Sequence, residues 1–572
     1  MLTQRPTPAF MSQEAARKLP RLALLALLAA FILSGLWAQD FWTLRDAEAF
    51  GIAREMLSGD ASTLLLPQIA GEALPYAGPA APWAAAFFMK LFSGLLGEVG
   101  AYRLTSLFWF ALSTAALWYG TWRLARRSEA QPVAFAFGGE AEPRQYGRAV
   151  ADCAVLLFVA TFGIFARQHE PVAGTVLLAC ASCVFFGIAL TLRRPEAGAF
   201  VTGLASGFAA LTTSVVPGLW LMGGAVLVHA FARTFPGSRD RRILTLLAGA
   251  ALPVVVWLGL VLALTGAEGE AWLAAWAAEE AERFDLVEPR TVLWMIRTSL
   301  WFLLPAWPLA LWALYSWRRQ IDRTQILVPA VFVVTALSAG LFTAPAAAES
   351  LLLAAVPGFV VLGAFGLITL RQSRENLLDW FAISVFSVAL AALWLYWFAN
   401  LLGFPPKMAR SIQMLSPGVT AEFGLGFVLP VLALVLWVVF VVWRLTHRPI
   451  VVWRGPWLAA SGMTAAAVTL CGLWHTAIDI NRSYAAPAKT AAAEAVRITG
   501  RPAPLVDGAG LPAGVRALFA WYGPVRFTRP GEAGDVRLVR TRSDEIPADA
   551  VSIEISRPHT NESFYLVPAN RR

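Results

Sequence analysis

Charged side chains are scarce in this chain: 15% of its 572 residues are charged, whereas 58% are hydrophobic. The mean hydropathy is +0.60, and an average soluble domain is about one quarter charged. These values exclude an ordinary soluble enzyme, because most of the surface must face lipid. The sequence therefore predicts an α-helical polytopic membrane protein.

Cysteine is also rare, and every cysteine falls inside an apolar run. The four positions are Cys153, Cys180, Cys183 and Cys471. This placement excludes a disulfide framework in the segments outside the membrane. The spacing of Cys180 and Cys183 would suit redox or metal chemistry, but no second ligand pair accompanies it. We interpret both cysteines as packing residues.

The net charge of +9 would suit a nucleic-acid-binding protein if the basic residues formed one surface. They lie instead in short clusters between apolar runs, which is typical of a membrane protein. Runs of about 20 apolar residues can cross the hydrocarbon core. The sequence predicts about thirteen such spans, centred near residues 29, 112, 158, 181, 204, 222, 254, 305, 335, 359, 390, 433 and 464.

The basic clusters also predict the orientation of the chain. With the N-terminus in the cytoplasm, every inner connection contains arginine, as the positive-inside tendency requires. We therefore expect a multi-pass protein of the bacterial inner (plasma) membrane. Its predicted parts are a transmembrane domain at residues 1–484, with a first outer loop at 39–99, and a soluble periplasmic domain at 485–572.

The first outer loop is predicted to hold two helices that lie on the membrane surface. Residues 44–58 form an amphipathic pattern, and residues 82–96 form a second apolar helix too short for a confident span. A crossing at 82–96 would invert every later loop. The C-terminal domain should be a small α/β unit, with a helix at 487–498 and strands near 504–507, 525–528, 536–540, 551–555 and 564–567.

Several motifs in the membrane part occur together in one order. The first loop contains Ile-Ala-Arg-Glu-Met at 52–56, then Gly59-Asp60, and further along a proline, a glycine and Tyr76. Further matches lie at residues 101–106, 203–207, 211–212 and 304–308 and at Pro357. This ordered set resembles the GT-C membrane glycosyltransferases, in the protein-mannosyltransferase and aminoarabinose-transferase-like group (glycosyltransferase family 39).

The resemblance implies a GT-C-like fold and a glycosyltransferase of the inverting type. Such enzymes move a sugar from a polyprenyl-phosphate donor to a lipid, glycan or protein acceptor at the outer face of the membrane. An acidic residue heading the first surface helix acts as general base in this chemistry. Cationic side chains or a metal stabilise the departing phosphate. No nucleic acid is expected as a partner.

By this resemblance the candidate catalytic residues are Asp46 and Glu48. Asp46 has a second interpretation, as a partner of the N-terminal dipole of its helix. The family's first acidic position falls on Arg45. Its Glu-Lys-Pro-Pro turn reads Ala-Gly-Pro-Ala at residues 77–80, and its Leu-Thr-Lys-Gly reads Leu-Thr-Thr-Ser at 211–214.

The candidate substrate- and phosphate-binding residues are Arg54, Arg103, Lys407, Arg410 and Tyr76. Arginine and lysine suit this role because they donate charge-assisted hydrogen bonds to phosphate oxygens. The alternative for Lys407 and Arg410 is a pair of cations resting at the lipid headgroups.

A divalent metal ion is a candidate cofactor, with His169 and Glu170 as its weak candidate ligands. Two adjacent residues are a poor chelate, so a solvated turn is the alternative. Two other functions are the alternatives: a catalytically weakened GT-C-like binding or assembly protein in envelope glycan synthesis, and a transporter. A transporter would place charges at mid-membrane and carry internal repeats, and the sequence shows neither.

Overall fold

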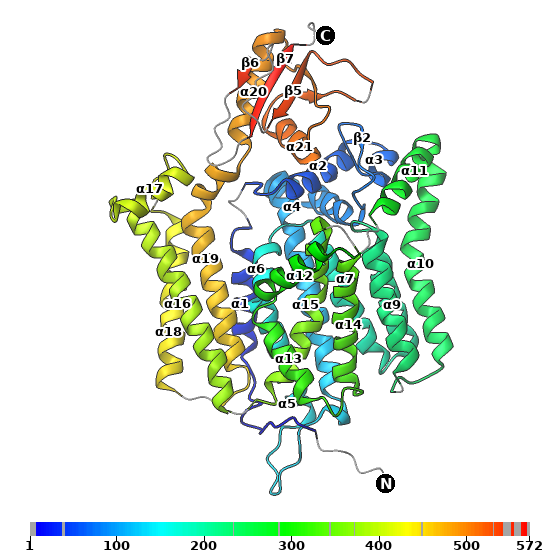
Figure 1. The fold of residues 1–572 in the computed structure, drawn as a ribbon, viewed down its shortest axis with the longest axis vertical. Coiled ribbons are helices and arrows are strands. Elements are labelled where there is room, and N and C mark those ends of the chain that lie inside the picture. Colours follow the sequence, from blue (N-terminus) through cyan, green and yellow to red (C-terminus); the bar gives the residue numbers. More distant parts are fainter. Residues whose placement is uncertain are drawn as a thin grey trace.

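The structure is a computed structural model that describes residues 7–36, 40–232, 234–283, 287–342, 345–370, 372–421, 423–447, 450–529, 531–541, 551–553 and 562–568. A bundle of long helices forms most of the molecule (Figure 1). The N-terminus lies at one end of the bundle, and a small domain with the C-terminus stands on the other end. We call these the N-terminal end and the C-terminal end.

The helices of the bundle have the following bounds: α1 (Arg21–Leu33), α4 (Ala80–Ala125), α5 (Pro143–Ala160), α6 (Phe162–Arg167), α7 (Ala173–Thr191), α8 (Pro195–Ala210), α9 (Val215–Phe231), α10 (Arg239–Leu264), α12 (Pro289–Phe302), α13 (Ala306–Ser316), α14 (Thr324–Leu341), α15 (Pro345–Leu367), α16 (Gln372–Leu402), α18 (Leu425–Thr446) and α19 (Arg454–Arg482). Eight described helices are long and apolar enough to cross a membrane, or nine if one bent pair counts as a span. The multi-pass α-helical fold is confirmed.

Twelve of the thirteen predicted span centres fall inside a described helix, and the one near residue 305 does not. There α12 ends at Phe302 and α13 begins at Ala306, with a bend of 97° between them. Pro305 stands at the break, and proline has no amide hydrogen to continue a helix in front of it. The span predicted near residue 305 is therefore a bent helix pair, which counts as one crossing only if the two helices are taken together.

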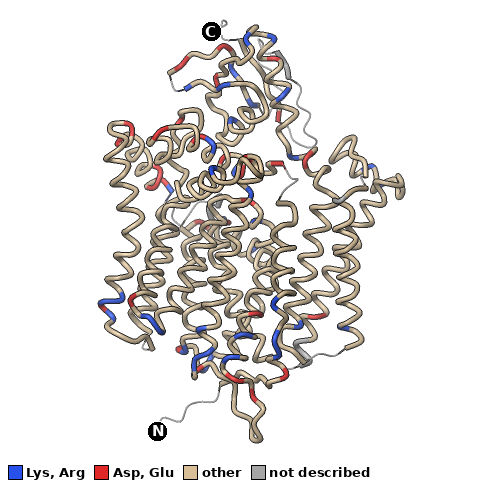
Figure 2. Tube along the Cα trace, turned by 180° about the vertical axis from the view of Figure 1, so that it is seen from behind, with Lys and Arg blue, Asp and Glu red and all other residues tan. Residues whose placement is uncertain are grey.

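The charged residues gather at the two ends of the bundle and are sparse between them (Figure 2). Basic residues concentrate at the N-terminal end, where the loops after α4, α7 and α9 lie. This separation follows from the cost of placing charge in hydrocarbon. It is the charge pattern from which the orientation was predicted.

Two helical segments lie across the C-terminal end of the bundle. The first is α2 (Leu44–Ser58), which begins where the Thr43 hydroxyl accepts a hydrogen bond from the Asp46 amide. The second is the start of α4, which bends at Gly97 with φ 71° and ψ 168°. Only glycine adopts such a backbone without strain. Both surface helices predicted for the first loop are therefore present, followed by the span that was expected.

Shorter elements fill the remaining loops at this end: α3 (Ala61–Leu65), the hairpin of β1 (Gln68–Ile69) and β2 (Glu72–Ala73), α11 (Gly266–Glu282) and α17 (Pro406–Leu415). None of these short elements was predicted from the sequence. A 3-10 turn, η1 (Ser128–Ala130), follows α4 at the other end.

The C-terminal domain is a five-stranded sheet with two helices. Its elements are α20 (Ala485–Thr499), β3 (Leu505–Asp507), α21 (Ala513–Tyr522), β4 (Arg526–Phe527), β5 (Val536–Thr541), β6 (Val551–Ile553) and β7 (Ser563–Pro568), and the strand order is β4-β3-β5-β7-β6. The pairs β3–β4 and β3–β5 are parallel, whereas β7 is antiparallel to β5 and β6. The five predicted strands and the first helix are confirmed. The end of the 551–555 run lies outside the described residues.

Helix α21 fastens this domain to the first loop. A side-chain carbon built on Gly51 of α2 would lie 2.6 Å from the Cβ of Ala517. One built on Gly514 would lie 2.2 Å from the Leu44 carbonyl oxygen. The two helices can approach so closely only because glycine stands at both positions. The predicted boundary at residue 484 falls between α19 and α20, but one hydrophobic core joins α2, α4, α20, α21 and the sheet.

Candidate functional site

A buried ion pair joins α2 to α4 at the bend of the chain. The Arg103 Nη2 lies 2.6 Å from the Asp46 Oδ2, and each side chain is 1% exposed. The Tyr102 hydroxyl donates to the Asp46 Oδ1 over 2.8 Å. The Arg103 guanidinium also lies 5.2 Å from the ring centre of Phe41. Burial raises the pKa of Asp46, while Arg103 and Tyr102 act against that shift.

A second carboxylate reaches this pair from the turn between α6 and α7. The Thr43 hydroxyl donates to the Glu170 Oε2 over 3.1 Å, so the residue that caps α2 also holds Glu170. Burial raises the pKa of Glu170 to about 7, the negative charge of Asp46 adds to the rise, and Arg103 opposes it. Glu170 keeps part of its surface exposed. We call Asp46, Arg103 and Glu170 the carboxylate centre.

Glu170 thus lies beside a predicted catalytic residue rather than in an isolated turn. The sequence suggested it only as a weak metal candidate with His169. A pKa near 7 suits a group that must take a proton and later release it at neutral pH. Of the three residues of the centre, Glu170 is the one with accessible surface.

His169 does not fit as a metal ligand. Its Nε2 lies 2.9 Å from the Phe31 carbonyl oxygen, and its ring also faces the carbonyl of Phe165. Burial lowers the pKa of His169. In the part of the chain that the structure describes, no three His, Cys, Asp or Glu side chains group together as metal ligands. We therefore assign no step to a metal, and a divalent ion stays a prediction.

Glu48 points away from the carboxylate centre. Residues two apart on an α-helix are separated by roughly 200° around its axis, so Glu48 and Asp46 face opposite sides of α2. Glu48 accepts a hydrogen bond of 3.2 Å from the Tyr76 hydroxyl. Burial raises its pKa, while Tyr76, Arg45 and Arg516 oppose the rise. The two predicted catalytic carboxylates therefore belong to different places.

The turn at residues 77–80 and the segment at 211–214 meet in space. A side-chain carbon on Gly78 would lie 2.3 Å from the Thr212 carbonyl oxygen, and the Ala80 amide donates to the Leu211 carbonyl over 3.0 Å. Arg283 at the end of α11 closes the contact by donating to the Tyr76 carbonyl over 2.7 Å. Tyr76 is thus held between α2 and α11 by its hydroxyl and its carbonyl.

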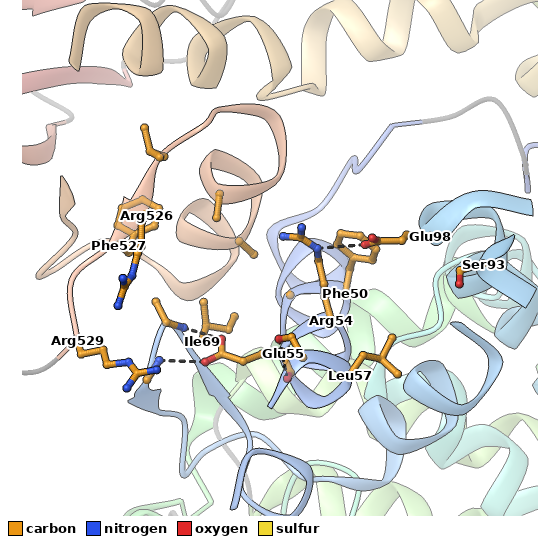
Figure 3. Close-up of a pocket in the computed structure, with 17 residues that line it drawn as sticks. Phe50, Arg54, Glu55, Leu57, Ile69, Ser93, Glu98, Arg526, Phe527 and Arg529 are labelled. Carbon is orange, nitrogen blue, oxygen red and sulfur yellow. Dashed lines mark hydrogen bonds and ion pairs between the residues drawn. The ribbon is translucent and has the colours of Figure 1, made fainter. Parts of the chain in front are cut away.

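Arg54 lies on a cleft formed by the first loop and the C-terminal domain. The cleft has a volume of about 690 Å³, and its charged residues are Arg54, Glu55, Glu98, Arg526 and Arg529. Figure 3 shows Arg54 directed at Glu98, with a distance of 3.1 Å between Nε and Oε2. Glu55 accepts the amides of Ala70 and Gly71 over 2.6 and 3.0 Å. The cleft thus offers both signs of charge.

The remaining predicted cations are separate from the centre. Lys407 and Arg410 lie on α17 and are exposed, and Figure 1 shows α17 at the edge of the bundle beyond α16 and α18, away from α2. Helix α17 is tied to α19, because the Asn481 side-chain amide donates to the Leu415 carbonyl over 2.7 Å. Of the predicted phosphate-binding residues, only Arg103 joins the carboxylate centre.

A polar link between distant parts of the chain adjoins the centre, and no pattern in the sequence predicted it. Asp40 accepts hydrogen bonds from the hydroxyls of Tyr522 and Ser483. Its own backbone carbonyl accepts a bond of 3.4 Å from Arg103 Nη2. The Asp40 amide donates to Asp479 over 3.1 Å. Burial and the negative charge of Asp40 raise the pKa of Tyr522. The C-terminal domain thereby helps to fix the segment before α2.

Two apolar grooves line the bundle. One, of about 560 Å³, lies between α1 and α4 and includes Leu28 and Leu107. The other, of about 490 Å³, lies among α6, α16, α17 and α19 and includes Phe165 and Trp474. Leu107 is one helical turn from Arg103, so the first groove approaches the centre.

Two solved structures have an architecture similar to that of this chain. The crystal structure of ArnT from Cupriavidus metallidurans bound to undecaprenyl phosphate matches with a TM-score of 0.65 and 16% identity, over 96% of this chain and 97% of that chain. The apo state of the same protein matches with a TM-score of 0.61 and 17% identity, over 96% and 98%. The fold is therefore the GT-C fold.

The GT-C fold is shared over nearly the whole chain, including the first loop and the C-terminal domain. At this level of identity the likeness establishes the fold and leaves the reaction to be argued from the site. Searches against protein-family models and curated protein sequences found no match.

Proposed function

We propose that this protein is a glycosyltransferase that moves a sugar from a polyprenyl-phosphate donor to a glycan, lipid or protein acceptor. The observation that carries the proposal is the carboxylate centre, where Asp46, Arg103 and Glu170 meet beneath the first-loop helices of a GT-C fold. The related ArnT structure is described as bound to undecaprenyl phosphate. A hydrocarbon tail needs an apolar surface open to lipid, and the bundle carries two apolar grooves.

In the proposed reaction the hydroxyl or amine of the acceptor attacks the anomeric carbon of the donor. The bond from that carbon to the phosphate oxygen breaks, and the electron pair leaves with the polyprenyl phosphate. Glu170 takes the proton of the attacking group, because it is the accessible carboxylate and its pKa of about 7 leaves much of it ionised at neutral pH. One displacement inverts the anomeric configuration.

Arg103 and Asp46 support this step from their buried positions. Arg103 is the cation that acts most strongly on the pKa of Glu170, and a fixed cation stabilises charge that develops on a departing phosphate. Asp46 holds Arg103 in place through their 2.6 Å contact. The predicted catalytic role of Asp46 is thus proposed to act through Arg103. Glu48 remains the rival base, on the other face of α2.

The acceptor is proposed to enter from the cleft. The positive and negative side chains of the cleft suit a hydroxyl-rich ligand. The ring of Trp521 lies 5.2 Å from the Arg54 guanidinium and supplies an aromatic face beside the cleft. We infer that the C-terminal end of the bundle lies on the periplasmic side, because the arginine-rich loops mark the other end as cytoplasmic. Donor, cleft and C-terminal domain would then share the outer face.

The test compares matched carboxylate variants in proteoliposomes with a radiolabelled polyprenyl-phosphate sugar. Glu170→Gln should lower the transfer rate at least about tenfold, the effect of losing a general base. Glu268→Gln, an exposed glutamate on α11, is the control and should transfer normally. If Glu48→Gln abolishes transfer while Glu170→Gln does not, the base is assigned to the wrong side of α2.

One observation favours a second candidate, a catalytically weakened binding or assembly protein. Arg45 occupies the family's first acidic position and is exposed, and the turn at Gly78 lacks the family's charged pair. Such a protein would bind the donor lipid without turnover. Donor binding by the wild type, with no transfer from any donor tested, would support this alternative.

A further inference from the structure

A second polar cavity lies at the opposite end of the molecule from the carboxylate centre. It has a volume of about 190 Å³ and lies where α4 and α7 end, beside the start of α5. Its lining residues are Trp122, Arg123, Arg126, Arg127, Leu192 and Arg193, with Ala189 behind them. We call this cavity the arginine pocket.

Most of the positive charge of the arginine pocket is not paired with a carboxylate of the described residues. Of its four arginines, Arg127 has an ion pair, at 3.0 Å from Glu129. Among the described residues, no carboxylate forms an ion pair with Arg123, Arg126 or Arg193. Arg194 lies close enough to add to the positive potential around Arg123.

The arginines are also held in place. The Arg126 guanidinium lies 4.4 Å from the ring centre of Trp122, and that of Arg123 lies 5.6 Å from the ring centre of Phe186. Gly147 of α5 makes room for Arg126, because a side-chain carbon there would lie 2.7 Å from its Cγ. Stacked guanidinium groups keep their hydrogen-bonding edges free for a ligand.

Two buried donors in the pocket lack a protein acceptor. The Nε atoms of Arg123 and Arg126 have almost no exposed surface and no hydrogen-bond partner in the described part of the chain. An unpaired buried donor costs free energy, and several like charges around one cavity add repulsion. An anion in the pocket would offset this positive charge. A cluster of arginines that served only to orient the protein in the membrane would need positive charge at this end of the bundle, but it would need neither a cavity nor buried donors.

We propose that the arginine pocket binds the phosphate of an anionic phospholipid from the leaflet at the N-terminal end. Arginine forks match the geometry of phosphate oxygens, and basic pockets between membrane helices are suited to lipid headgroups. Trp122 belongs to the residue type enriched at the membrane interface. The site is independent of the proposed sugar transfer, since it lies at the other end of the bundle.

The experiment measures lipid binding to the purified full-length protein by native mass spectrometry and by melting temperature in detergent. The three additives are phosphatidylglycerol, zwitterionic phosphatidylcholine and inorganic phosphate. The test variant is Arg126→Gln/Arg193→Gln. The matched control is Arg241→Gln/Arg318→Gln, which removes the same charge from exposed positions at the start of α10 and just after the end of α13.

Phosphatidylglycerol should bind to the wild type and the control and raise their melting temperatures, and phosphatidylcholine should not. The test variant should lose about tenfold or more in affinity for phosphatidylglycerol. Equal losses in both double variants would show that only total charge matters and would overturn the proposal. Protection by inorganic phosphate equal to that by phosphatidylglycerol would overturn the lipid assignment. If the test variant fails to fold, Arg126→Lys is measured in its place. This change keeps the positive charge but removes the forked guanidinium group, and it should weaken phosphatidylglycerol binding by less than the tenfold expected of the double variant.

Discussion

Replacing Arg103 by methionine should destabilise the protein by about 3–5 kcal/mol, the usual cost of leaving one buried charge without its partner. The size follows from the burial of both groups, each 1% exposed, and from the 2.6 Å contact between Nη2 and Oδ2. Methionine keeps much of the length and apolar character of the arginine stem. The loss is therefore electrostatic rather than a loss of volume.

The comparison variant is Arg54→Met, which breaks the ion pair with Glu98. Those side chains are 45% and 40% exposed, so this change should cost about 1 kcal/mol or less. The double variant Asp46→Asn/Arg103→Met removes both buried charges and should recover much of the stability of the single Arg103 variant. Unfolding of the purified proteins in detergent measures all three. An Arg103→Met variant no less stable than Arg54→Met would refute the reasoning.

Three further predictions concern the site. The pKa of Glu170 is raised from 4.5 to about 7, so between these pH values the folded state holds a proton that the unfolded chain releases, and the free energy of unfolding falls as pH rises from about 4.5 to 7. The rate of sugar transfer should rise through about pH 7. Glu170→Gln should flatten both pH profiles. Gly78→Ala should lower the melting temperature by forcing its side chain against Thr212, whereas Gly94→Ala, in open space, should not; equal melting temperatures would contradict the packing. His169→Ala should leave any dependence of transfer on Mg²⁺ unchanged in an EDTA titration, because its ring faces backbone carbonyls, and a dependence lost in this variant alone would restore His169 as a ligand.

Much of the fold could be predicted because hydrophobic periodicity reports directly on burial. The spans, the two first-loop helices and the short strands of the C-terminal domain all leave such a pattern. The break at Pro305 was missed because the apolar run continues through it. Helices α11 and α17 were missed because each is largely exposed, so no long apolar run marks its position.

The candidate site could be predicted less well, because it is assembled from distant segments. Asp46 and Arg103 were each predicted as site residues, but no sequence pattern indicates that they pair. Tyr102, the neighbour of Arg103, is 56 residues away from Asp46 along the chain. The contact of Tyr522 with Asp40 spans 482 residues. Helix geometry alone could have separated Asp46 from Glu48, because two residues on one helix face opposite sides.

The most direct test of the account is sugar transfer by the wild-type protein in proteoliposomes. The protein would be supplied with a panel of radiolabelled polyprenyl-phosphate sugars and an acceptor extract from bacterial envelopes. The account predicts label in the acceptor together with release of polyprenyl phosphate, and loss of at least about tenfold of that rate in Glu170→Gln. A folded wild-type protein that binds the donor and transfers no sugar from any member of the panel would contradict it.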